Sequence, residues 1–171
     1  MIFLKYVSIF LLFITSSFIG ILYSKKYSDR VKDLEEIKSA LNMFKTKIKF
    51  TYEPIPEVFE EISKNVKNNI AKIFEKASIY MKTDIITNAW GKSLEEEKNN
   101  TSLTKSDIEI IKGLSTLLGN VDLEGQVNNI NLINELIDKQ IEEARVEKNK
   151  NEKLYKTLGA SIGLTIAIIL I

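Results

Sequence analysis

The feature that most constrains this chain is a run of 18 uncharged residues near its beginning, residues 6–23. As an α-helix rising about 1.5 Å per residue, this run and the apolar residues before it cover the roughly 30 Å hydrocarbon layer of a bilayer. The competing reading is a cleaved signal peptide with Lys5 as its basic region. The run is longer than a usual signal-peptide core, however, and Lys25 and Lys26 follow it as a stop-transfer pattern. We therefore expect residues 1–24 to be a retained transmembrane anchor.

A second apolar run occupies residues 157–171 and reads TLGASIGLTIAIILI. Its 15 residues span only about 22 Å as a helix, but the preceding Leu154 and Tyr155 extend it, with Lys153 and Lys156 reaching toward water. The alternative is a buried core helix. Because the run is apolar on all sides and has no polar face, we expect it to be a short transmembrane helix.

Basic residues flank both apolar runs on the side of the long segment between them. They are Lys25, Lys26, Arg30, Lys32, Arg145, Lys148, Lys150, Lys153 and Lys156. Basic residues near membrane spans favour the cytoplasmic side, so residues 25–156 are expected to be cytoplasmic, with both termini on the opposite face. All 23 acidic residues and all 24 basic residues except Lys5 lie in this loop. A neutral loop with basic edges fits a domain that contacts proteins and also touches anionic lipid.

Helical spacing recurs throughout the loop, and the sequence has only two prolines and seven glycines to interrupt it. An apolar stripe on the first long segment comprises Val31, Leu34, Ile37, Leu41, Phe44 and Ile48. A second stripe comprises Leu123, Val127, Ile130, Ile133, Ile137, Ile141 and Ala144. Because both segments join the membrane, we expect them to form an antiparallel stalk of residues 28–50 and 122–153. The sequence predicts a fully helical (all-α) fold: an antiparallel bundle of about five to six helices between two transmembrane helices.

The remaining loop residues, 54–121, are expected to form a cap of shorter helices. Pro54 and Pro56 should end the first stalk helix and start the next one. Asn68–Asn69 predicts a break and an N-cap for a new helix. A short helix is expected around 83–98, where Trp90 has apolar neighbours and is read as a core residue rather than a ligand platform.

The clearest helix start in the cap is at Thr104, which can act as N-cap with Asp107 at the third helical position. Leu103 and Ile108 have the spacing of a hydrophobic staple. The helix should bury an inner stripe of Ile108, Ile111, Leu114 and Leu118 and stop at Gly119–Asn120, and Asp122 can then cap the last helix.

Composition excludes several enzyme classes. The chain has no cysteine and no histidine, which removes disulfides, thiolate metal sites and histidine-based catalysis. It has no phosphate-binding loop, and its near-zero net charge gives no field for nucleic acid. Acidic residues gather at Glu57, Glu60, Glu61, Glu95, Glu96, Glu97, Glu142 and Glu143. Paired carboxylates can do acid–base work or bind Mg²⁺, but beside many lysines they are read as solvated faces.

We therefore expect no catalytic residue, cofactor or metal, although a Ser–Lys dyad stays open. The first two acidic groups, Glu57, Glu60 and Glu61 with Glu95, Glu96 and Glu97, are a candidate surface for docking a partner. Gly159 and Gly163 place small residues on one face of the second span. Such a face lets another transmembrane helix approach closely, and the alternative is ordinary glycine enrichment in membrane helices.

Several stretches occur together in a familiar order. They are Tyr52 to Pro54–Ile55, Ala89–Trp90 with Ser93–Leu94, Leu103 with Lys105–Ser106, Leu118–Gly119 with Asp122, Lys150-Asn151-Glu152-Lys153, Lys156, and Leu158–Gly159. In this order and spacing the chain resembles the stage III sporulation protein AB family of endospore-forming bacteria over essentially its whole length. None of these stretches is a catalytic signature.

The resemblance implies a fold similar to the cytoplasmic domains of the inner-membrane platform protein (F component) of type II secretion and type IV pilus systems. It implies a place in the complex linking mother cell and forespore, in the mother-cell membrane facing the forespore. The expected partners are a cytoplasmic secretion-type ATPase similar to stage III sporulation protein AA, other channel subunits, the lipid bilayer and further copies of the chain. The alternatives are a membrane-anchored structural or sensory coiled coil without an ATPase partner, and a membrane hydrolase that uses carboxylates or serine.

Overall fold

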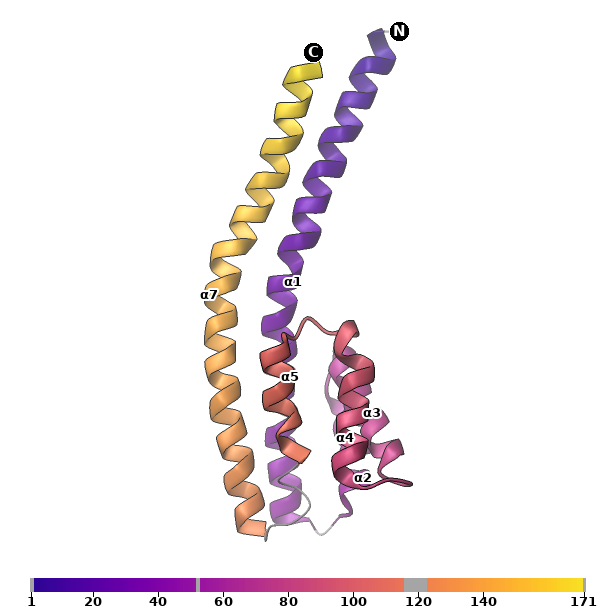
Figure 1. Cartoon of the computed structure of the whole chain (residues 1–171), viewed down its shortest axis with the longest axis vertical. Helices are drawn as coiled ribbons and strands as arrows, with labels where there is room; N and C mark the ends of the chain where they lie inside the picture. The colour runs from indigo at the N-terminus through magenta and orange to yellow at the C-terminus, as the bar shows by residue number, and fades with distance from the viewer. Residues whose placement is uncertain (1, 52, 116–122, 171) are drawn as a thin grey trace. The chain divides into compact units, whose positions relative to one another are not determined.

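The computed structural model describes residues 2–51, 53–115 and 123–170. Within these ranges the chain is helical between short turns and contains no strand, which confirms the predicted all-α fold. The two longest elements are α1, Ile2–Phe50, and α7, Leu123–Leu170 (Figure 1). Four predictions fall outside the described residues. They are the turn at Tyr52, the core position of Leu118, the helix stop at Gly119–Asn120 and the cap at Asp122.

The chain divides into two compact units. The terminal unit comprises Met1–Asp29 and Glu143–Ile171, and the central unit comprises Arg30–Glu142. The central unit contains the second part of α1, the first part of α7 and the elements between them. These are α2 (Ile55–Asn65), α3 (Asn68–Tyr80), α4 (Ile86–Glu97), the short 3-10 helix η1 (Lys98–Asn100) and α5 (Lys105–Lys112).

The terminal unit exposes many large apolar side chains. Phe10 and Phe18 on α1, and Ile162 and Ile169 on α7, each leave more than half of their surface uncovered. Both helices are long and apolar enough to span a membrane, and only 11% of the most apolar 18-residue window of each is buried. A buried core helix at residues 157–171 does not fit this exposure, whereas hydrocarbon would cover these side chains without cost.

In the central unit, α1 and α7 run antiparallel, as predicted. The Lys38 ammonium is 2.5 Å from an Asp138 carboxylate oxygen, and Lys45 donates to the side-chain oxygen of Asn131 at 3.1 Å. As the residue number increases along α1, the residue number of its partner on α7 decreases, as expected for antiparallel helices. Where the structure describes their side chains, both predicted stripes are largely buried, but Ile48 and Val127 are only partly covered.

The start of α2 follows the predicted proline pattern. Helix α1 ends at Phe50, Pro54 occupies the N-cap of α2, and Pro56 and Glu57 lie in its first turn. The missing N–H of proline costs nothing at a helix start, and a carboxylate is favourable near the positive end of the helix dipole.

The predicted break before α3 is present, but the expected capping role of asparagine is wrong. Val66 and Lys67 have extended backbone, so Lys67 is the N-cap of α3 and makes no side-chain capping bond. Asn68 is the first helical residue, with a φ of 59°. Asparagine tolerates this left-handed conformation better than most residues, which explains its place at the break.

Helix α5 begins as predicted and ends earlier than expected. Thr104 Oγ1 accepts the Asp107 backbone N–H at 3.2 Å, and an Asp107 carboxylate oxygen accepts the Thr104 N–H at 2.8 Å, which completes a capping box. The helix ends at Lys112, with Gly113 as its C-cap, although residues 114 and 115 are helical again. Ile111 and Leu114 are buried as predicted, whereas Ile108 is only partly covered.

Four aromatic rings from four helices form the centre of the core. Phe59 meets Phe44, Phe74 and Trp90 edge-on or nearly so, at centroid separations of 5.2, 5.2 and 5.5 Å. Trp90 is fully buried, and its indole N–H donates to the Ile111 carbonyl at 3.0 Å. Trp90 is therefore the core residue that the sequence predicted, and its one polar group is satisfied within the protein.

The aromatic cluster predicts that replacing Phe59 with alanine lowers the stability of the central unit far more than replacing Phe50. Phe59→Ala should destabilise the central unit by about 3–5 kcal/mol, because it leaves a cavity and removes three ring contacts. Phe50→Ala should change stability by less than about 0.5 kcal/mol, because Phe50 is 73% exposed. Urea unfolding of the detergent-solubilised chain, followed by fluorescence of its only tryptophan, measures both effects. Equal midpoints for the two variants would contradict the packing.

Candidate functional site

The two glycines predicted as a packing face lie against α1 of the same chain, inside the terminal unit. A Cβ on Gly159 would lie 3.0 Å from the Gly20 Cα and from the Ser16 carbonyl oxygen. A Cβ on Gly163 would lie 3.0 Å from the Phe13 ring and 3.2 Å from its Cα. At both positions a Cβ would be closer to α1 than an ordinary van der Waals contact, so a side chain there would require α1 or the Phe13 ring to shift.

The contact is close from the α1 side as well. A Cβ on Gly20 would lie 2.6 Å from the Tyr155 carbonyl oxygen. Ser16 Oγ donates to the Gly159 carbonyl oxygen at 2.8 Å. The small-residue face on α7 was predicted but its partner on α1 was not, although Ser16, Gly20 and Ser24 recur there at intervals of four residues. In this structure the helix that approaches Gly159 and Gly163 is the chain's own α1.

The acidic group Glu57, Glu60 and Glu61 lies on the exposed side of α2, as predicted. Glu60 pairs with Lys64 at 2.8 Å, and this hydrogen bond lowers the pKa of the Glu60 carboxyl. Glu61 pairs with Lys47 of α1 at 2.5 Å. These contacts fit a solvated, charge-balanced surface rather than a paired-carboxylate catalytic site.

The second acidic group is not uniformly solvated. Glu95 and Glu96 are exposed, but Glu97 is only 4% exposed, which corrects the expectation for this residue. Lys76 of α3 lies 2.6 Å from a Glu97 oxygen and 2.9 Å from a Glu96 oxygen. Its hydrogen bonds lower the pKa of both carboxyls, and those to Glu97 and Glu96 raise the pKa of Lys76. Glu97 thus joins α3 to α4 and is a poor candidate for partner contact.

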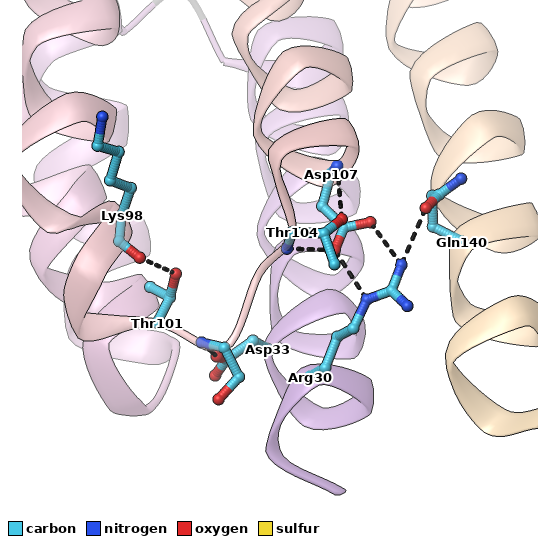
Figure 2. Close-up of polar contacts among 8 residues, drawn as sticks. Arg30, Asp33, Lys98, Thr101, Thr104, Asp107 and Gln140 are labelled. Atoms are coloured by element: carbon cyan, nitrogen blue, oxygen red, sulfur yellow. Dashed lines mark hydrogen bonds and ion pairs between the residues drawn. The ribbon is translucent and has the colours of Figure 1, made fainter. Parts of the chain in front are cut away.

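A buried polar network in the central unit was not anticipated (Figure 2). Arg30 Nε donates to one Asp107 oxygen at 2.9 Å, and Arg30 Nη2 donates to the other at 3.0 Å. The same Nη2 donates to Gln140 Oε1 at 3.0 Å. Arg30 is 6% exposed and Asp107 fully buried, so a buried bidentate ion pair joins α1 to α5, and the bond to Gln140 connects α7 to it.

This network corrects the role given to Arg30. The sequence analysis counted Arg30 among the basic residues near the membrane surface, but its guanidinium is buried against Asp107. The composition contained an indication that Arg30 has a special role, because this lysine-rich chain has only two arginines, Arg30 and Arg145. Arginine forms the planar, two-pronged contact that a buried carboxylate needs, and lysine cannot replace it.

A groove of about 600 Å³ lies along α1 and α2 in the central unit. Its lining residues are Glu35, Lys38, Ser39, Asn42, Met43, Thr46, Lys47, Glu61, Ile62 and Asn65. The walls offer opposite charges already engaged in ion pairs, namely Lys38 with Asp138 and Lys47 with Glu61. Within the described ranges, no three acidic side chains gather closely enough to hold a metal ion.

The terminal and central units together define a class: an all-α protein with two helices suited to a bilayer. The sequence profile of the family described as "Stage III sporulation protein AB" matches residues 5–171. A relative of that name from Bacillus subtilis (strain 168) is 25% identical over 169 residues, covering 98% of this chain and 99% of the relative. A solved structure named stage III sporulation protein AB is similar with a TM-score of 0.67 and 22% identity, covering 71% of this chain and 98% of its own.

The chain therefore belongs to the stage III sporulation protein AB family, as the resemblance indicated. Family membership supports a role in a sporulation complex, and the two apolar helices are consistent with a membrane location. The comparisons do not confirm the predicted likeness to the platform proteins of secretion and pilus systems.

The glycine contact predicts that Gly159→Val separates the helices of the terminal unit, because its side chain would collide with Gly20 and Ser16. Ala160→Val is the matched control, since Ala160 is exposed. The chain has no cysteine, so spin labels on cysteines introduced at exposed Ile19 and Ser161 report the separation without background. The distance distribution should broaden in Gly159→Val and stay unchanged in the control. An unchanged distribution in both variants would contradict the close approach.

The buried ion pair predicts a strong effect of Asp107→Ala, about 3–5 kcal/mol of lost stability, because it leaves the Arg30 charge buried without a partner. Asp138→Ala removes an ion pair whose side chains are 37% and 50% exposed and should cost less than about 1 kcal/mol. Urea titrations followed by Trp90 fluorescence compare the two variants in the full-length chain. A loss below 1 kcal/mol for Asp107→Ala would show that the network carries no stability.

Proposed function

We propose that the chain is a non-enzymatic membrane platform component of the mother cell–forespore channel or secretion-like complex. In this role the terminal unit lies in the mother-cell membrane facing the forespore, and the central unit lies in the cytoplasm. The central unit docks a cytoplasmic secretion-type ATPase of the stage III sporulation protein AA kind and couples it to other membrane subunits of the channel.

The observation that carries the proposal is the continuity of the two long helices. Helix α1 runs unbroken from Ile2 to Phe50, and α7 from Leu123 to Leu170, so each contributes to both units. A continuous helix resists bending over this length, because every turn is closed by backbone hydrogen bonds. A tilt that a partner imposes on the central unit can therefore reach the apolar segments through the backbone of the same helices.

The proposed docking surface for an ATPase consists of exposed acidic residues. Glu57, Glu60 and Glu61 on α2, and Glu95 and Glu96 on α4, keep their carboxylates at the surface. These positions suit a partner with basic side chains, since exposed charges steer association and set specificity more than they add affinity. Glu97 is left out of this surface because it is buried against Lys76.

The orientation rests on the exposed lysines next to the apolar segments. Lys25 and Lys26 on α1, and Lys150 and Lys153 on α7, remain exposed, whereas Arg30 is withdrawn into the core. The basic flank thus persists on both helices without Arg30, and it favours a cytoplasmic central unit.

The proposal predicts that the detergent-solubilised chain co-purifies with the ATPase encoded by the same sporulating cell. Inserting Gly-Pro after Asn149 should interrupt α7 and abolish spore formation, while membrane insertion and ATPase binding persist. The same insertion after Thr83, in the turn between α3 and α4, is the matched control and should have a much weaker effect.

Two results would contradict the proposal. Spore formation at the normal level with the Asn149 insertion would argue against coupling through α7. Failure of the intact chain to bind the ATPase would favour the alternative, a membrane-anchored scaffold without an ATPase partner.

A further inference from the structure

We propose that the terminal unit carries a binding site for the phosphodiester headgroups of anionic phospholipids. The site, called here the basic collar, consists of Lys25, Lys26, Lys153 and Lys156 around a stack of three tyrosines. The proposal rests on membrane insertion of the terminal unit, which is part of the proposed function, but not on an ATPase or a channel.

The tyrosine stack sets the four lysines at one level. The Tyr155 ring of α7 stacks on Tyr23 of α1 at 6.0 Å and on Tyr27 at 5.8 Å, with interplanar angles of 20° and 21°. Tyr23 and Tyr27 are about one helical turn apart, so Tyr155 lies at the height of the residues between them. Lys25 and Lys26 lie between Tyr23 and Tyr27 in the sequence, and Lys153 and Lys156 lie on either side of Tyr155.

This level is also where the apolar surface ends on both helices. On α1 the exposed apolar side chains Phe18 and Leu22 precede Tyr23, and on α7 the exposed Leu158 and Ile162 follow Tyr155. Tyrosines are enriched at the boundary between hydrocarbon and headgroups, because the ring is apolar and the hydroxyl is polar. The stack therefore marks the headgroup layer, and lysines beside it extend their ammonium groups among the phosphates.

The charge at this level is strongly positive. Residues 23–27 and 152–158 contain four lysines and one acidic residue, Glu152, which leaves a net charge of +3. Lys25, Lys26 and Lys153 are exposed, and Lys156 is exposed while pairing with Glu152 at 2.6 Å. Clusters of basic residues next to a membrane span attract anionic lipid electrostatically. A phosphate oxygen carried by a lipid reaches this collar at its natural depth, whereas free phosphate gains no such positioning.

Lipid selectivity of the full-length chain tests the collar. The chain is reconstituted in phosphatidylcholine vesicles with a trace of spin-labelled phosphatidylglycerol or spin-labelled phosphatidylcholine. The fraction of each probe immobilised by the protein is then read from electron paramagnetic resonance spectra. We expect phosphatidylglycerol to associate about threefold or more better than phosphatidylcholine, and the preference to shrink in high salt. Inorganic phosphate at equal concentration should not displace the lipid.

Replacing all four collar lysines with glutamine should bring the preference close to one. The matched control replaces four exposed lysines of the central unit, Lys72, Lys82, Lys105 and Lys139, and should keep the preference. Tyr155→Ala should weaken the preference and Tyr155→Phe should preserve it, because the stack needs the ring.

Three outcomes overturn the inference. Equal immobilisation of both lipids by the unaltered chain would show that the basic collar does not distinguish an anionic headgroup from a neutral one. An equal loss in the control variant would assign the effect to overall charge rather than to the collar. Immobilisation of neither lipid would show that the terminal unit is not in the bilayer, and it would overturn the membrane platform as well.

Discussion

Antiparallel packing of α1 against α7 is the constraint on which the rest of the structure depends. In the central unit, Lys38 with Asp138 and Asn42 with Asn134 join the two helices, and the short helices complete a core over them. In the terminal unit the same two helices meet through Gly20 and Gly159. Each helix is therefore adapted to two surroundings, a water-covered bundle in one part and an apolar medium in the other.

The central unit also contains a polar interaction that is costly to break. Burial of Arg30 and Asp107 removes both charges from water, and only the bidentate geometry with the added bond to Gln140 offsets that cost. Asp107 serves the capping box of α5 at the same time. Asp107 thus fixes the start of a short helix and also holds Arg30, whose bond to Gln140 links the two long helices. Such a group specifies a unique arrangement more than it adds net stability, which is how buried ion pairs act in some other proteins.

The sequence predicted much of this fold because its signals are local. The spacing of apolar residues predicted both long helices and their antiparallel arrangement. The prolines predicted the start of α2, and the Thr104 capping box predicted the start of α5. Burial of Trp90 followed from its apolar neighbours.

The missed features depend on pairs far apart in the chain. Nothing near Arg30 in sequence indicates that Asp107 lies beside it, and nothing near Glu97 indicates that Lys76 covers it. The left-handed start at Asn68 replaced an expected cap because the break lies at Val66 and Lys67, two residues earlier than the asparagines. The partner of Gly159 was missed for a different reason: its signal is local, in the four-residue spacing of Ser16, Gly20 and Ser24, but large apolar residues separate these small ones.

The contact between Gly20 and Gly159 has a consequence for how the terminal unit tolerates sequence change. In a bilayer its outward-facing residues would meet only fluid hydrocarbon, so leucine, isoleucine, valine and phenylalanine should replace one another there with little effect. A Cβ on Gly20 or Gly159 would press on the backbone of the facing helix, so a methyl group at either position requires the two helices to move apart. A survey of all substitutions across this unit should therefore show three intolerant glycines, Gly20, Gly159 and Gly163, within a permissive stretch, which is the inverse of the pattern in a water-soluble core.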